Sequence, residues 1–219
     1  ALAAQAGAVA LRGGAFKPRS SPYAFAGHGR EALGWMRAAA RDHDLAVVTE
    51  VLSERDVEAV AAAADVLQIG SRNMQNFALL RAAGATGRPI LLKRGMAATL
   101  DEWLLAGEHL LAAGAGTVVF CERGVRGFDP RTRNLLDLAT VALLRGLGQP
   151  VAVDPSHAVG RRDLIAPLAA AARAAGADAI LVEVHPDPGA ARSDGPQALD
   201  AAGLRAVADA LGLTPKERS

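Results

Sequence analysis

Positively charged side chains recur directly after short apolar runs of this sequence. Six of them end such a run or lie in the loop that follows it: Arg12, Lys17, Arg19, Arg72, Lys93 and Arg123. An arginine binds carboxylate or phosphate through paired hydrogen bonds, whereas a lysine acts as a point charge. Each of these residues taken alone is interpreted as a solvated surface charge. Six of them at the carboxyl ends of parallel strands together predict a binding site for a small polyanion.

A second set combines one imidazole with two carboxylates. His157, Glu183 and Asp194 lie in or directly after the last two of these loops, and a histidine with two carboxylates suits a divalent cation of intermediate hardness. Three ligands make a partial site, and a hydrogen-bonded loop histidine is the alternative for His157. His185 lies close to Glu183, and spacing alone does not separate a ligand from a supporting residue.

The elements that must position these residues follow from apolar patterning. Nearly continuous apolar runs, typical of parallel strands buried on both faces, are found at Ala8–Arg12, Leu45–Glu50, Asp65–Ile69, Pro89–Lys93, Thr117–Cys121, Pro150–Asp154 and Ala179–Val184. Helical patterns are found at Arg30–Asp42, Asn73–Arg81, Thr99–Ala113, Arg133–Leu144, Asp163–Ala175 and Pro196–Leu211. We expect Leu135, Leu138 and Ala142 to form one buried helix face, and Asp163 to be an N-cap.

Strands alternating with helices in units of roughly 30 residues predict an α/β fold. A (β/α)8 TIM barrel is favoured over an open doubly wound sheet, because no G-x-G-x-x-G follows the first strand. Residues 1–7 resemble the end of a helix that stops at Gly7, so the strand before that helix is missing. We therefore expect one catalytic domain over residues 1–219, N-terminally incomplete and with a polar tail at 212–219; a natural seven-stranded variant is the alternative.

The composition of the chain limits the kinds of binding partner that we expect. Lysine and arginine number 24 against 23 acidic residues, so no global field favours nucleic acid or an anionic membrane. The single cysteine, Cys121, excludes an intramolecular disulfide within this chain, which fits a reducing cytoplasm. We interpret Cys121 itself as a small buried apolar side chain.

Six ordered motifs connect these residues to a known family: LRGGAFKPRSSPYAF, QIGSRNMQN, LLKRGMAAT, CERGVR, DPSHAVGRRD and EVHPDP with SDG. Together they resemble the 3-deoxy-D-arabino-heptulosonate 7-phosphate (DAHP) synthases from about residue 10 to residue 195. The resemblance implies condensation of phosphoenolpyruvate with erythrose 4-phosphate, the first step of the shikimate pathway. The related octulosonate 8-phosphate synthases have a Lys-Ala-Asn-Arg-Ser-Ser type stretch, whereas Lys17-Pro18-Arg19-Ser20-Ser21 resembles the four-carbon version.

The resemblance also implies roles for individual residues. Phosphoenolpyruvate would be held by Arg12, Arg72, Lys93 and Arg123. Lys17 would stand between the substrates, and Arg19 and Ser20 would hold the erythrose phosphate. His157, Glu183 and Asp194 would be ligands of a divalent metal of the Mn, Fe, Co or Zn class, and Lys17, Glu122 and His185 are the candidates for proton transfer.

The fourth metal ligand of the family is a cysteine in a Gly-Pro-Cys turn, which would precede residue 1. Cys121 belongs to another motif and does not take that role. Without the thiolate we expect a Mg- or Ca-like site of poor affinity.

Two other functions stay open: an octulosonate 8-phosphate synthase that uses arabinose 5-phosphate, and a non-catalytic phosphometabolite-binding homologue. We also expect a homo-oligomer, with any feedback control in a missing N-terminus or a regulatory partner chain.

Overall fold

The computed structural model describes residues 1–18 and 21–213. Contacts divide the chain into two compact units. Unit 1 comprises residues 1–7, 96–98 and 120–219, and unit 2 comprises residues 8–95 and 99–119. All but the first two residues of the expected polar tail, 212–219, lie outside the described residues.

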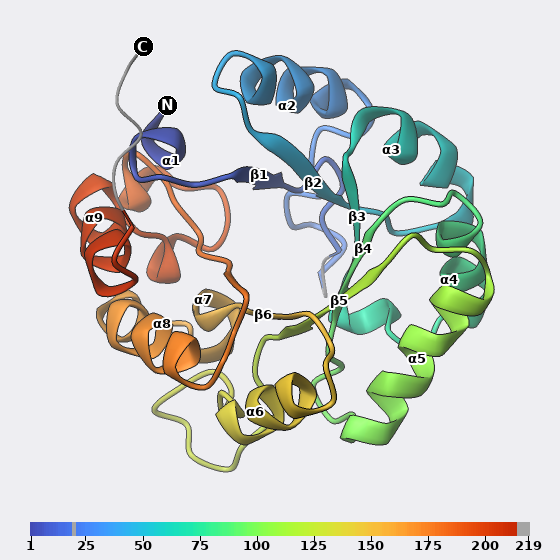
Figure 1. Ribbon diagram of the computed structural model, residues 1–219. Coiled ribbons are helices and arrows are strands. Elements are labelled where there is room, and N and C mark those ends of the chain that lie inside the picture. The colour runs from blue at the N-terminus through green and yellow to red at the C-terminus, as the bar shows by residue number, and fades with distance from the viewer. Residues whose placement is uncertain (19–20, 214–219) are drawn as a thin grey trace. The chain divides into compact units, whose positions relative to one another are not determined.

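Parallel strands form the framework (Figure 1). They are β1 (Ala10–Gly13), β2 (Ala46–Glu50), β3 (Val66–Ile69), β4 (Ile90–Lys93), β5 (Val118–Glu122), β6 (Val151–Val153) and β7 (Ala179–Ile180). Their order in the sheet follows the sequence from β1 to β7. The prediction of an α/β fold with seven parallel strands is therefore confirmed.

In unit 2 the strands alternate with four helices, α2 (Glu31–Arg41), α3 (Val57–Ala63), α4 (Phe77–Gly84) and α5 (Leu100–Ala112). Strand β4 is buried at every position, as expected for a strand covered on both faces. Helix α5 begins at a capping box in which Thr99 and Glu102 bond each other's backbone N–H. This cap directs the fully buried Trp103 inward, where its indole N–H donates to the Leu92 carbonyl at 3.2 Å.

Unit 1 contains α1 (Leu2–Gln5), α6 (Leu138–Gly146), α7 (Pro155–Val159), α8 (Ile165–Ala174) and α9 (Ala201–Ala210). Helix α1 agrees with the expected helix end before Gly7. Helices α8 and α9 pack together over a small core of Ile165, Ala169, Leu199 and Val207.

Some expected boundaries are wrong. Helix α6 begins at Leu138 and not at Arg133, because the Asp137 side chain accepts the N–H of Thr140 and so caps the helix there. Leu135 instead pairs with Val125 in an antiparallel bridge and is 62% exposed, so the helix face expected around it does not form.

Two further expectations in unit 1 are also wrong. Asp163 lies in a 3-10 turn and forms an ion pair with Arg161 at 2.6 Å, and the N-cap of α8 is Leu164. Strand β7 ends at Ile180, well before Val184. Helices α3 and α7 were not expected.

An aspartate beside a strand start is used in the same way in both units. The Asp65 carboxylate accepts the Val47 N–H at 2.8 Å and pairs with Arg37. Asp178 accepts the Val151 N–H at 3.0 Å and pairs with Arg145. Each aspartate thus ties the start of one strand to its neighbour and to a helix.

Candidate active site

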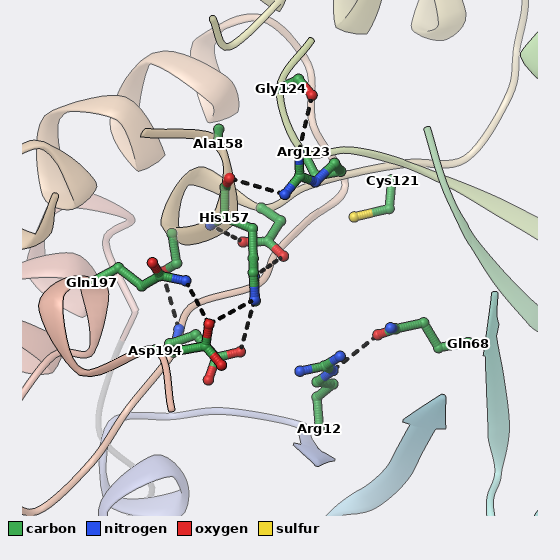
Figure 2. Close-up of polar contacts among 12 residues, drawn as sticks. Arg12, Gln68, Cys121, Arg123, Gly124, His157, Ala158, Asp194 and Gln197 are labelled. Atoms are coloured by element: carbon green, nitrogen blue, oxygen red, sulfur yellow. Dashed lines mark hydrogen bonds and ion pairs between the residues drawn. The ribbon is translucent and has the colours of Figure 1, made fainter. Parts of the chain in front are cut away.

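Arg12, at the end of β1, is held by a buried polar network in unit 2. Its Nε donates to Gln68 Oε1 at 2.9 Å (Figure 2), and its Nη2 pairs with Glu50 Oε2 at 3.4 Å. Gln68 Nε2 donates to the same Glu50 oxygen at 3.2 Å. Because Glu50 and Gln68 are 6% and 1% exposed, this Arg12 network fixes the orientation of the guanidinium without help from a ligand.

Strand register brings the network together. Arg12 pairs with Val48, two residues before Glu50, and Glu50 pairs with Gln68. Since side chains alternate along a strand, all three project from the same face of the sheet. Room for the carboxylate comes from Gly70, where an added Cβ would lie 2.0 Å from Glu50 Oε1.

The other cations expected to bind substrate differ in exposure. Lys93 ends β4 and is 4% exposed, whereas Arg72 lies in a 3-10 turn, Ser71–Asn73, and is exposed. The loop after β1 folds back so that the Lys17 N–H donates to the Ala26 carbonyl at 2.9 Å. Arg19 and Ser20 lie outside the described residues.

In unit 1, His157 is oriented by the residue that caps its helix. Asp154 is the N-cap of α7, and its carboxylate accepts the His157 N–H at 2.9 Å and contacts the ring Nδ1 at 2.8 Å. A proton on Nδ1 then leaves the lone pair of Nε2 on the side of Glu183 and of Asp194, and Figure 2 shows Asp194 beside the ring. A histidine oriented by a carboxylate in this way is typical of metal ligands.

The distances between His157, Glu183 and Asp194 show whether this trio could bind one cation. His157 Nε2 lies 3.6 Å from Glu183 Oε1 and 4.0 Å from Asp194 Oδ1. These gaps exceed a hydrogen bond, and they suit donors about 2.1 Å from one shared ion. Within the described residues, however, no group of three or more His, Cys, Asp and Glu is arranged so that it could hold a metal ion. The trio fits a divalent cation in donor type, and its arrangement is incomplete as a site.

Neighbouring polar side chains bind the two carboxylate residues. The Glu183 N–H donates to Ser156 Oγ at 3.0 Å, and Ser156 is fully buried. Asp194 has a left-handed backbone, with φ of 60°, and its Oδ1 accepts from Gln197 Nε2 at 3.3 Å. Ser156 and Gln197 were not singled out from the sequence, and Asp154 was identified only as the polar end of an expected strand. The Asp-Pro pair at 154–155 was the available signal, because aspartate at an N-cap before proline typically starts a helix.

Arg123 and two of the three candidates for proton transfer, Glu122 and His185, also lie in unit 1. Burial lowers the pKa of Arg123, an effect opposed by the charge of Asp154. Glu122 is fully buried and accepts the Gly124 N–H at 2.6 Å. The Asp187 N–H donates to His185 Nδ1 at 3.0 Å. A ring held in this way carries its proton on Nε2 when it is neutral.

Comparison with known proteins decides the family. Residues 1–214 match the model of the DAHP synthetase I family. The chain belongs to this family. The resemblance inferred from the six motifs is thereby confirmed.

Sequence identity to individual members of the DAHP synthetase I family differs. It is 48% identical over 215 residues to the phospho-2-dehydro-3-deoxyheptonate aldolase of Thermotoga maritima, covering 94% of this chain and 64% of that protein. A 2-dehydro-3-deoxyphosphooctonate aldolase of Acidithiobacillus ferrooxidans is 34% identical over 194 residues, covering 82% of this chain and 68% of that protein.

Solved structures of this family have a similar fold. The crystal structure of the Thermotoga maritima aldolase, a DAHP synthase, superposes with a TM-score of 0.93 and 46% identity, covering 96% of this chain and 62% of that one. A truncated form of the Thermotoga maritima synthase has a TM-score of 0.89 and 43% identity, covering 96% of this chain and 77% of that one. The chain thus spans less than two thirds of the length of the full-length Thermotoga relative.

Proposed function

We propose that this protein condenses phosphoenolpyruvate with erythrose 4-phosphate and water to give DAHP and phosphate, the first step of the shikimate pathway. The observation that carries the proposal is the 48% identity to the heptonate aldolase of Thermotoga maritima, against 34% to an octonate aldolase. The KPRSS sequence at residues 17–21 supports the same choice between the two reactions.

In this proposal the cations of unit 2 bind the substrates. Arg12, Arg72 and Lys93 hold the carboxylate and phosphate of phosphoenolpyruvate. Lys17 stands between the substrates, and Arg19 with Ser20 holds the erythrose phosphate. The Arg12 network supports this assignment, because a guanidinium already fixed by Gln68 and Glu50 loses little conformational freedom when it binds an anion.

In unit 1, Arg123 contributes to phosphoenolpyruvate binding and His157, Glu183 and Asp194 hold a divalent metal of the Mn, Fe, Co or Zn class. The metal, when bound, supplies a Lewis acid for the aldehyde oxygen. The support is the imidazole orientation imposed by Asp154 and the two carboxylates facing Nε2.

The chain's own residues then guide the bond changes. C3 of phosphoenolpyruvate attacks the aldehyde carbon, and the Lys17 ammonium delivers a proton to the new alkoxide. Water adds at C2 with Glu122 and His185 as its acid–base partners, and collapse of the resulting hemiketal expels inorganic phosphate. The arginines stabilise the charge that develops on the phosphate.

We further propose that the seven strands belong to a (β/α)8 barrel and that the protein forms homo-oligomers in the cytoplasm. A regulatory partner chain is part of the same proposal. The TM-score of 0.93 to the Thermotoga structure supports the barrel. None of the described helices is long and apolar enough to cross a membrane.

The function is tested by measuring phosphate release from phosphoenolpyruvate with either erythrose 4-phosphate or arabinose 5-phosphate. The reactions contain Mn²⁺, Fe²⁺, Co²⁺ or Zn²⁺ in turn. We expect release to be faster with erythrose 4-phosphate. Faster release with arabinose 5-phosphate would assign octulosonate synthesis, and no release with either sugar and any metal would leave a phosphometabolite-binding homologue.

A further inference from the structure

Helix α7, which carries His157, is too short to stabilise itself. It has five residues, Pro155–Val159, and a single turn is only marginally stable without outside contacts. The last carbonyls of a helix also lack partners within it. Groups that bind the carbonyls of residues 157–159 therefore help Asp154 to hold the His157 ring in place.

Asn134 binds two of these carbonyls with its side chain. Its Nδ2 lies 3.2 Å from the His157 oxygen and 3.3 Å from the Ala158 oxygen. The backbone N–H groups of Asn134 and Arg133 donate to the Ala158 and Val159 carbonyls at 2.8 and 3.0 Å. Asn134 is 4% exposed, so water does not readily replace these bonds.

Arg123 shares one of these acceptors. Its Nη2 donates to the His157 carbonyl at 3.1 Å (Figure 2), and its Nη1 donates to Gly124 at 3.3 Å. Gly124 in turn packs directly against Asn134, because a Cβ added at Gly124 would lie 2.7 Å from the Asn134 Cβ. Asn134 thus contacts both the helix of His157 and the turn of Arg123.

We propose that Asn134 is a positioning residue that holds Arg123 and His157 in one fixed arrangement through the shared His157 carbonyl. This inference rests on the proposed function only for the roles of Arg123 in anion binding and of His157 in metal binding. Loss of the Asn134 amide leaves the His157 carbonyl to Arg123 alone and loosens the end of α7, so both roles weaken together. An apolar residue of similar size removes the donor while it preserves the volume.

The test compares Asn134→Leu with the unchanged protein in two binding measurements without turnover. Free Mn²⁺ is titrated by electron paramagnetic resonance, and phosphoenolpyruvate binding is followed by calorimetry. We expect the Mn²⁺ dissociation constant to rise roughly tenfold, as for other residues that support a metal ligand, and phosphoenolpyruvate binding to weaken severalfold. Asn134→Gln, which keeps the amide on a longer stem, should recover part of both affinities.

Leu135→Ala is the matched control, since this neighbour in the same loop is 62% exposed; both its affinities should stay unchanged. If Asn134→Leu does not fold, Asn134→Ser replaces it. The inference is overturned if the folded variant keeps both affinities, or if Leu135→Ala weakens them equally. It is also overturned if the unchanged protein binds neither Mn²⁺ nor phosphoenolpyruvate. Binding of both without phosphate release would instead refute the proposed reaction alone.

Discussion

The two units hold their functional side chains in different ways. In unit 2, Arg12, Glu50 and Gln68 stand on three neighbouring strands, and strand register brings them together. In unit 1, His157 stands on a one-turn helix, and Glu183 and Asp194 lie outside the strands, so bonds between side chains and backbone hold them. In unit 2 the many hydrogen bonds between strands hold the functional side chains in place. In unit 1 a few side-chain hydrogen bonds do so.

One contact between strand and helix is the same in both units. Asp65 in unit 2 and Asp178 in unit 1 make the same pair of contacts, to a strand N–H and to a helix arginine. The two units thus share this contact and differ in how their functional side chains are held. We therefore expect ligand binding in unit 1 to be most sensitive to the loss of single polar groups. We expect the stability of unit 2 to be sensitive to added volume as well.

The largest effect is expected in unit 1, from Asp154→Ala. This change removes the partner of His157 Nδ1 together with the N-cap of α7. Mn²⁺ affinity should fall by about 10- to 100-fold, measured by paramagnetic titration. Asp137→Ala removes the comparable cap of α6 and should leave Mn²⁺ binding intact; equal loss in both variants would contradict the role of Asp154.

In unit 2, Gln68→Leu should weaken phosphoenolpyruvate binding. It removes the acceptor for Arg12 Nε within a buried network, and hydrogen bonds to charged groups are worth about 1.5–3 kcal/mol. Calorimetry should show a dissociation constant roughly 10- to 100-fold higher, with Mn²⁺ affinity preserved. Unchanged phosphoenolpyruvate affinity would mean that Glu50 orients Arg12 without Gln68.

Added volume in unit 2 is tested by Gly70→Ala. The new Cβ would lie 2.0 Å from Glu50 Oε1, and relief of such a clash typically costs about 1–3 kcal/mol of stability. Gly34 in α2 has nothing within 4 Å of an added Cβ, so Gly34→Ala should stabilise by about 0.5–1 kcal/mol. Urea unfolding of both variants gives the comparison, and equal stability would show that Glu50 moves aside freely.

The smallest effect is expected at Asp65. The Val47 N–H, with help from Arg37, holds the pKa of Asp65 below its ordinary value of 3.8. The ionised carboxylate therefore stabilises the folded state above that value, and this contribution is lost as the pH falls through the lowered folded pKa.

Asp65→Asn should accordingly lower the free energy of unfolding near neutral pH by less than about 1 kcal/mol, since the pair is partly exposed. In strong acid the variant and the unchanged protein should unfold alike. Denaturant titrations at both pH values measure the difference, and a larger loss in acid would reverse the expected sign. Asp178→Asn serves as the comparison in unit 1 at neutral pH.

Much of the fold was predictable because its signals are local. Continuous apolar runs indicated the seven strands, and the helical pattern expected from Thr99 agrees with the start of α5 at Leu100. Helix α6 was misplaced because Leu135 fits a helical pattern, yet pairs with Val125. Helix α7 was missed since five residues carry too little periodicity to detect.

The sequence by itself determined the α/β class, the family and the chemical types at the strand ends, since these depend on residue order and local patterning. Tertiary structure alone decided which polar groups meet. Gln68 lies 56 residues from Arg12, and Asn134 lies 23 residues from His157. Such pairs form only when strand register and loop packing bring distant segments within hydrogen-bonding distance, because no local propensity of the chain encodes them.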